Sequence, residues 1–289
     1  MSPVAREIRR IVVALDDSME SRLVLDEAVA LAVRMKADLA GLFVEDATLL
    51  NAAQLSFVRQ VSLSGRAVEA MDAGMLERSL RGQAEAIRAA LQRAAVRHKL
   101  AWSFRVARGK ASVHILAAVA DADLVIMGKT TPAVTRRARM GATARIVAGA
   151  PRGSILFSEP RLRRVLGGAG PVVVIYGDGR HADDVLGLAI NLARAAEKDL
   201  VVLIPADTHD DGRATQANVS AQLANAQVRA TFRLCAGRGC DALVHTLSGH
   251  RGDLLVLAQD SPLLGSDTVA DLIERLESPV LVVATDQPS

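Results

Sequence analysis

The segment 127–147, MGKTTPAVTRRARMGATARIV, brings two glycines and several basic residues together. Gly128 ends an apolar run and Gly141 stands where a new helix would begin, and between them lie Arg136, Arg137 and Arg139. Backbone N–H groups at a glycine turn and at a helix N-terminus favour anions, because their dipoles point toward the ligand. The spacing therefore predicts a phosphate cradle, although a solvated basic loop would have the same composition.

Asp16 is a second candidate, because it directly follows the short apolar run Ile11–Leu15. In open α/β sheets, ligands bind at the carboxyl ends of the strands, near the point where the strand order reverses. The same position suits a helix N-cap, which Ser18 could also provide. Capping and ligand contact are therefore both open for Asp16. Another apolar run ends at Val44, and the residues from there to Asp46 are a third candidate group.

Other reactive residues do not form a convincing catalytic or metal pattern. The tripeptide 128–130, GKT, is like the end of a Walker A loop, but Asp123 stands where that motif needs its first glycine. Cys235 and Cys240 lack the spacing of a zinc motif. We therefore interpret them as buried thiols or as thiols without a functional role. No Ser-His-Asp order or carboxylate pair supports acyl transfer or hydrolysis. We therefore expect a protein that is not an enzyme.

The elements that must position these residues occur twice along the chain. Residues 11–46 align without a gap with residues 172–207, and residues 108–129 align with residues 238–259. Two ungapped blocks in the same order indicate a tandem duplication. The segment between the blocks is shorter in the second copy.

Each copy alternates strands with helices, as the first copy shows. Short apolar runs predict strands at Ile11–Leu15, Leu39–Val44, Trp102–Val106, Leu124–Met127 and Ser154–Phe157. Helical spacing predicts helices at Leu23–Arg34, Met75–Lys99, Val113–Ala120 and Thr143–Ala148. The less periodic stretch Leu49–Met71 suggests short helix and loop. This alternation predicts an α/β fold of two tandem, doubly wound parallel-sheet domains, at residues 1–160 and 171–289, joined by a linker at 161–170.

Composition narrows the classes of partner. Half of the 289 residues are hydrophobic, which is enough for a large core. Only 2% are aromatic, which argues against a nucleic-acid binder that stacks bases on aromatic rings. No apolar run approaches the roughly 18 to 20 residues of a membrane span, and two cysteines in the whole chain suit a reducing compartment. We therefore expect a cytoplasmic protein that binds neither nucleic acid nor membrane.

With these features the first copy resembles a universal stress protein domain, and the whole chain resembles a tandem universal stress protein. The resemblance covers essentially all of residues 9–158 and, more loosely, residues 171–285. It rests on the segments IVVALDDS at 11–18, LFVED at 42–46, RGK at 108–110, DLVIMG at 123–128 and APRGSILF at 150–157. It implies a Rossmann-like fold of the adenine nucleotide alpha hydrolase-like type in both copies.

The family's ATP-binding signature is Gly, two residues, Gly, nine residues, Gly, and then Ser or Thr. It falls here on Gly128, Thr131, Gly141 and Ala142, so two of its four positions match. Thr131 adds a Cβ where the family brings its backbone close to phosphate, which restricts φ or crowds the ligand. Ala142 lacks the hydroxyl, although Thr143 stands next to it.

The resemblance implies an adenine nucleotide (ATP, ADP or AMP) in the first copy, and Mg²⁺ could accompany it. The family's early Asp, which holds ribose or base, matches Asp16, and its adenine-flanking residue on the second strand matches Val44. Backbone amides near the two glycines would bind phosphates. The expected site residues are Asp16, Val44, Met127, Gly128, Lys129, Thr131, Arg137, Gly141, Ala142 and Thr143.

The second copy departs further from the family pattern. Gly177 occupies the position of Asp16, and Ala258 that of Gly128. The loop from Ala258 to Gly265 is seven positions long, against thirteen in the first copy. A loop of half the length cannot easily wrap a triphosphate, so we expect this second site to be inactive.

Two functions follow as hypotheses. The first is a regulatory protein that binds an adenine nucleotide and signals to a protein partner, whose identity the sequence does not give. The second is a scaffold of the same fold that binds no nucleotide and acts in a stress response. Asp16 and the two glycines favour the first hypothesis, whereas Thr131 and Ala142 favour the second.

The duplication also predicts how the copies assemble. Single-domain members of the family often pair through their final strands, which here are the apolar segments Ser154–Phe157 and Val280–Val283. An unpaired apolar edge strand is an aggregation hazard. Up to Ser158 the chain holds 23 Lys and Arg against 15 Asp and Glu, and from Glu159 it holds 12 against 17, so the halves carry +8 and −5. We expect a pseudo-dimer within the chain, and a homodimer of whole chains is a further option.

Overall fold

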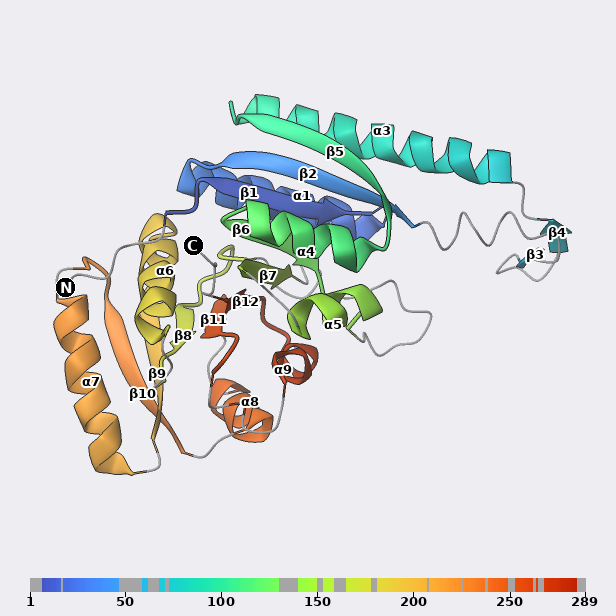
Figure 1. Cartoon of the computed structure of the whole chain (residues 1–289). Helices are drawn as coiled ribbons and strands as arrows, with labels where there is room; N and C mark the ends of the chain where they lie inside the picture. Colours follow the sequence, from blue (N-terminus) through green and yellow to red (C-terminus); the bar gives the residue numbers. More distant parts are fainter. Residues whose placement is uncertain are drawn as a thin grey trace.

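The structure is a computed structural model, and its main feature is one large sheet with helices on both faces (Figure 1). It describes residues 7–16, 18–46, 59–61, 68–70, 73–129, 140–149, 153–158, 165–177, 181–206, 208–224, 226–236, 239–248, 253–261, 264 and 268–284. No helix in these ranges is both long and apolar enough to cross a lipid bilayer.

The first half alternates strands and helices as the sequence predicts. Its strands in the large sheet are β1 (Arg10–Leu15), β2 (Asp38–Asp46), β5 (Trp102–Gly109), β6 (Leu124–Gly128) and β7 (Ser154–Ser158). Its helices are α1 (Met19–Met35), α3 (Ala73–Arg97), α4 (Ala111–Asp121) and α5 (Ala142–Gly149). The predicted elements are confirmed, with bounds that shift by up to four residues.

The second half repeats this alternation. Its strands are β8 (Val172–Ile175), β9 (Leu200–Ala206), β10 (Ala230–Ala236), β11 (Leu254–Ala258) and β12 (Val280–Val283). Its helices are α6 (Ala182–Ala195), α7 (His209–Leu223), α8 (Cys240–Ser248) and α9 (Val269–Arg275).

The stretch Leu49–Met71 differs from the prediction of helix and loop. Its described residues form two short strands, β3 (Arg59–Val61) and β4 (Val68–Ala70), which pair antiparallel as a separate hairpin. The rest of that stretch lies outside the described residues. A three-residue strand is too short to show a period-2 pattern, so the sequence carries no clear signal for it.

The ten strands of the large sheet run in the order β10-β9-β8-β11-β12-β7-β6-β1-β2-β5. In this sheet the strands contributed by one half pair only in parallel, and the first strand of each half lies between its second and its fourth. The strand order therefore reverses at β1 in the first half and at β8 in the second. This is the doubly wound arrangement that the sequence predicts, and its switch point is where ligands bind in such sheets.

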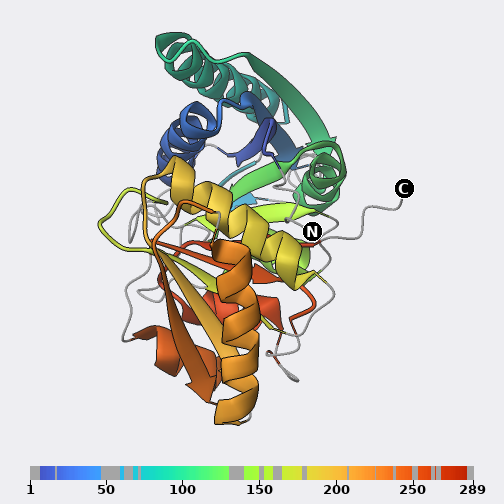
Figure 2. The same cartoon turned by 90° about the vertical axis from the view of Figure 1, so that its left-hand side faces the viewer.

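Two helix layers cover the sheet. The residues of β1 alternate, so that Ile11, Val13 and Leu15 pack with α1 and α3 on one face and Val12 packs with α4 and α5 on the other. In the second half α6 and α7 join the first face, and α8 and α9 join the second. In the two views α3 and β5 lie at one end of the molecule and α7 and β10 at the other (Figures 1 and 2).

The halves meet at β7 and β12, the final strands of the two copies. These strands pair antiparallel, with Phe157 opposite Val280 and Ile155 opposite Val282, and all four side chains are buried. The sheet is therefore continuous across the halves, and the predicted pseudo-dimer through the final strands is confirmed. Burial of both apolar edges explains why the copies stay together.

The described part of the predicted linker is packed against the first half. Val165 donates its backbone N–H to Glu27 Oε1 at 2.8 Å, and Arg34 of α1 donates to the Leu166 carbonyl at 2.9 Å. Both linker side chains are buried in the core next to α1. These contacts fix residues 165 and 166 of the linker to helix α1.

Candidate functional site

A cavity of about 280 Å³ lies at the switch point, where β1 and β6 end. The starts of α1 and α5 and parts of β2 and α4 complete its wall. Eight of the ten residues expected from the sequence line it: Asp16, Val44, Met127, Gly128, Lys129, Gly141, Ala142 and Thr143. The other two, Thr131 and Arg137, lie outside the described residues, as do Arg136 and Arg139.

Asp16 shapes the turn between β1 and α1. Its Oδ1 accepts hydrogen bonds from the backbone N–H of Ser18 at 3.0 Å and from the hydroxyls of Ser18 and Ser21. The N-cap of α1 is Ser18, whose Oγ accepts from the backbone N–H of Ser21 at 3.1 Å. Asp16 is exposed, and its Oδ2 accepts no hydrogen bond from a described residue. One oxygen of this carboxylate therefore holds the turn while the other faces solvent.

The opposite wall of the cavity is apolar. Leu42, Ile115 and Met127 are buried, and Val44 is half-buried beside them. These side chains come from β2, α4 and β6, so three elements meet at this wall. Such a surface accommodates the flat faces of a heterocyclic ring without requiring hydrogen bonds.

At the phosphate end, two of the expected amides are already hydrogen-bonded. Lys129 donates its backbone N–H to the Ser158 carbonyl at 2.8 Å, and Gly141 donates its own to the Lys129 carbonyl at 3.1 Å. An anion must therefore rely on the first-turn N–H groups of α5, beginning at Ala142 and Thr143. The first four N–H groups of an α-helix have no acceptor within the helix, and the helix dipole adds partial positive charge there.

Solved structures resemble this architecture over nearly its whole length. A universal stress protein from Archaeoglobus fulgidus DSM 4304 matches with a TM-score of 0.72 at 14% identity, covering 97% of this chain and 99% of its own. A protein of unknown function from Pseudomonas aeruginosa PAO1 matches with a TM-score of 0.62 at 17% identity, covering 98% and 94%. The chain has the universal stress protein fold, twice in tandem. No family model and no curated protein matches its sequence.

A similar fold also occurs in a domain of a transport protein. The cytoplasmic domain of a prokaryotic cation chloride cotransporter matches with a TM-score of 0.51 at 13% identity, covering 96% of this chain and 95% of its own. The universal stress protein fold alone therefore does not decide the function, which has to be argued from the site.

In this tandem universal stress protein fold, Lys129 connects the cavity to the second half. Its side chain is 3% exposed, and its Nζ donates to the carbonyl of Leu276, the C-cap residue of α9. The sequence placed the backbone amide of Lys129 at the phosphates and made no prediction for its ammonium group, which points to the other half of the molecule. The sequence gives no signal for this contact, because the two residues lie 147 positions apart.

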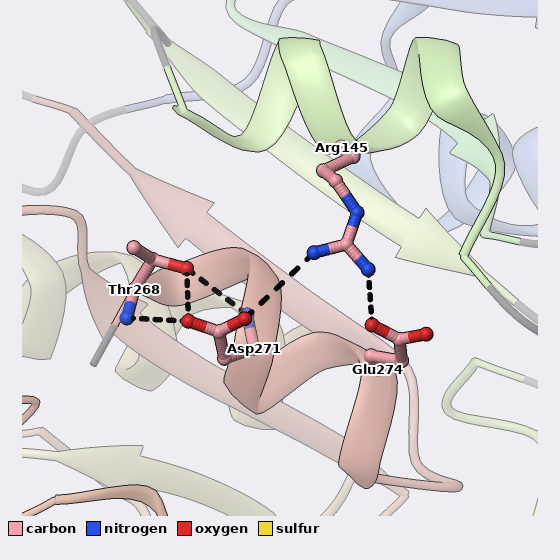
Figure 3. A network of polar contacts seen from close by, with 4 residues as sticks. All are labelled: Arg145, Thr268, Asp271 and Glu274. Atoms are coloured by element: carbon pink, nitrogen blue, oxygen red, sulfur yellow. Dashed lines mark hydrogen bonds and ion pairs between the residues drawn. The ribbon is translucent and has the colours of Figure 1, made fainter.

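A polar network joins α5 to α9 in the same region (Figure 3). Arg145 of α5 pairs with Glu274 and, at 3.7 Å, with Asp271. Asp271 accepts from the Thr268 hydroxyl at 2.6 Å and from the Thr268 backbone N–H at 3.0 Å in a capping box. These hydrogen bonds, followed by the positive charges of Arg145 and Arg275, lower the pKa of Asp271 below its ordinary value. Helix α5, whose N-terminus lines the cavity, is therefore also held in place by contacts with the second half.

The equivalent region of the second half has different residues. Gly177 follows β8 and Ala258 ends β11, as expected from the repeat, whereas Gly265 and Ser266 lie outside the described residues. Across the described residues, no group of three or more His, Cys, Asp or Glu side chains is arranged to hold a metal ion.

Proposed function

We propose that this protein is a regulatory protein of the universal stress protein type that binds one adenine nucleotide in its first half. The observation that supports this most is the gathering of eight expected residues around one cavity at the switch point. An apolar wall, an exposed carboxylate and an open helix N-terminus lie around that cavity. These are the three surfaces that base, ribose and phosphates require, so the residues present fit the ligand.

Each part of the nucleotide has a matching surface. The base would lie against Val44 and Met127, and the outward-facing oxygen of Asp16 would accept from the ribose hydroxyls. The phosphates would bind the backbone N–H groups at the start of α5. Mg²⁺, where it accompanies ATP, would be held by phosphate oxygens and water, together with a carboxylate where one is within reach.

We propose binding without turnover. The described lining of the cavity contains no histidine and no cysteine. Histidine is the commonest general base, and cysteine is among the strongest protein nucleophiles. Binding should be modest, because two amides at the cradle already donate to backbone carbonyls.

Titration calorimetry of the full chain with ATP, ADP, AMP and adenosine tests the proposal. We expect one binding event per chain, with the phosphate-bearing ligands binding more tightly than adenosine. The variant Asp16→Ala should weaken all four ligands. The control Asp38→Asn changes an exposed carboxylate at the other end of β2 and should change none of them. Absence of heat and of thermal stabilisation with every ligand at millimolar concentration would refute nucleotide binding.

Ala142→Pro tests the phosphate end specifically. Ala142 is the first residue of α5, where proline is tolerated because its missing N–H has no partner in the helix. The variant should therefore fold but bind ATP and ADP more weakly, with adenosine unaffected. His209→Pro places a proline at the first residue of α7, after the extended N-cap residue Thr208, and is the control. Equal binding of ATP by both variants would place the phosphates elsewhere.

The arginines of the loop give a further prediction from the sequence. Replacing Arg136, Arg137 and Arg139 by Gln should weaken ATP more than adenosine, because each lost charge-assisted contact at an exposed site is worth on the order of 1 kcal/mol. Calorimetry with both ligands measures the difference. Equal loss for ATP and adenosine would mean that this loop does not approach the phosphates.

A scaffold without nucleotide is the second candidate function. One observation favours it: the backbone amides of Lys129 and Gly141 already donate to backbone carbonyls. Fewer amide N–H groups are therefore available to bind phosphate. A chain that purifies without nucleotide, as measured by native mass spectrometry, and that binds none in calorimetry would favour this alternative.

A further inference from the structure

A second and larger cavity, of about 680 Å³, lies between α1 and α3. It is on the face of the sheet opposite α4 and α5, and it shares Leu15, Asp16, Ser18 and Ser21 with the switch-point cavity. Its apolar surface comes from Leu15, Leu25 and Ile87 and from four alanines of α3 between positions 86 and 94. The volume falls in the range of small-molecule sites, which is roughly 300 to 1,000 Å³.

Three arginines line the same groove: Arg22 of α1, and Arg93 and Arg97 of α3. All three are exposed, and none of them forms an ion pair with a described residue. Two carboxylates also line it, Asp16, whose Oδ1 is bound by serines, and Asp26. The guanidinium groups therefore outnumber the carboxylates, and the groove favours an anion.

The second half carries different residues at the equivalent positions. The repeat aligns Leu15 with Tyr176 and Arg22 with Asp183. The Tyr176 hydroxyl donates to Asp183 Oδ1 at 2.8 Å, and Gln222 of α7 donates its Nε2–H to the same oxygen at 3.0 Å. Tyr176 is only 7% exposed, and its ring is larger than the side chain of Leu15, which is buried at the equivalent position.

The chemistry of the lining defines the ligand. Its apolar side chains are aliphatic, and none of the described residues that line it has an aromatic ring to stack on a base. We propose that the groove between α1 and α3 binds an anionic amphiphile, a single alkyl chain that carries a carboxylate or phosphate head. The chain would lie along the alanines of α3, and the head would pair with the arginines. The arginines and alanines that would hold this ligand do not line the proposed nucleotide site, although the two cavities share Leu15, Asp16, Ser18 and Ser21.

Titration of the full chain with octanoate, octyl phosphate and 1-octanol, each below its aggregation limit, tests the inference. At least one of the two anions should bind with 1:1 stoichiometry and at least about ten-fold more tightly than 1-octanol, because only the anions can pair with guanidinium groups. The tighter of the two anions identifies the head group. Failure of both anions to bind, or equal affinity for 1-octanol, would overturn the proposal.

Two variants locate the binding. Arg93→Gln with Arg97→Gln changes two exposed residues and should weaken the anion roughly ten-fold while leaving 1-octanol and ATP unchanged. The matched control is Arg88→Gln, on the same helix but outside the lining. Leu15→Tyr with Arg22→Asp copies the residues of the second half and should abolish binding of the anion. Wild-type affinity in the arginine variant would refute the site even if the second variant fails to fold.

Discussion

Lys129 connects the two halves through a single buried ammonium group. Lys129→Met keeps most of the aliphatic side chain but leaves the Leu276 carbonyl without its donor. Loss of a buried hydrogen bond of this kind lowers the free energy of unfolding by about 1–3 kcal/mol. Urea denaturation measures it, with the exposed residue Lys110 changed to Met as control. Equal stability of the two variants would show that the contact contributes little.

Asp271 predicts a dependence of stability on pH. Its folded-state pKa lies below its ordinary value of 3.8, because Thr268 and two arginines favour the charged form. The unfolded chain therefore binds this proton more readily than the folded chain. The stabilisation is complete above that ordinary pKa and is lost as pH falls through the lower, folded-state value.

Asp271→Asn should therefore be less stable than the wild type at neutral pH, and the difference should shrink below about pH 4. Urea denaturation of both proteins at neutral and at acidic pH measures the change. Asp260→Asn, at an exposed position, is the control. If the difference in stability between Asp271→Asn and the wild type is the same at both pH values, the ionised Asp271 carboxylate is not its source.

At the scale of elements, β7 depends on β12 for one of its two partners. Expression of residues 1–160 alone leaves the buried strand Ser154–Ser158 as an apolar edge. We expect a self-dimer or an aggregate, because unpaired edges recruit other strands. Size-exclusion chromatography with light scattering measures the mass. If residues 1–160 form a monomer that is as stable as the whole chain, this prediction is wrong.

Most elements could be predicted because each buried strand is a continuous apolar run, as at Ile11–Leu15 and Leu124–Met127. The site could be placed because a family pattern marks the ends of those strands. The contacts that Lys129 and Tyr176 make could not be predicted, since their partners come close only when separate elements pack. For the same reason, the sequence could not show that the Gly141 amide is already bonded.

At the scale of the whole molecule, the continuous sheet predicts that the two halves unfold together. Trp102, the only tryptophan, is in β5 of the first half, whereas far-UV circular dichroism reports on both halves. We expect the two signals to change together in urea, because separation of the halves would expose two buried apolar strands. Two distinct transitions would show that the halves unfold independently.

The position of β12 in the middle of the sheet has a consequence for biosynthesis. Roughly 120 residues separate β7 from β12, so a ribosome at about 5–20 residues per second needs about 6–24 seconds to supply the partner strand. During that interval the nascent first half exposes an open apolar strand. Neighbouring chains on one polysome could exchange their final strands, and the interlocked dimers that result would have the same sheet as the single chain.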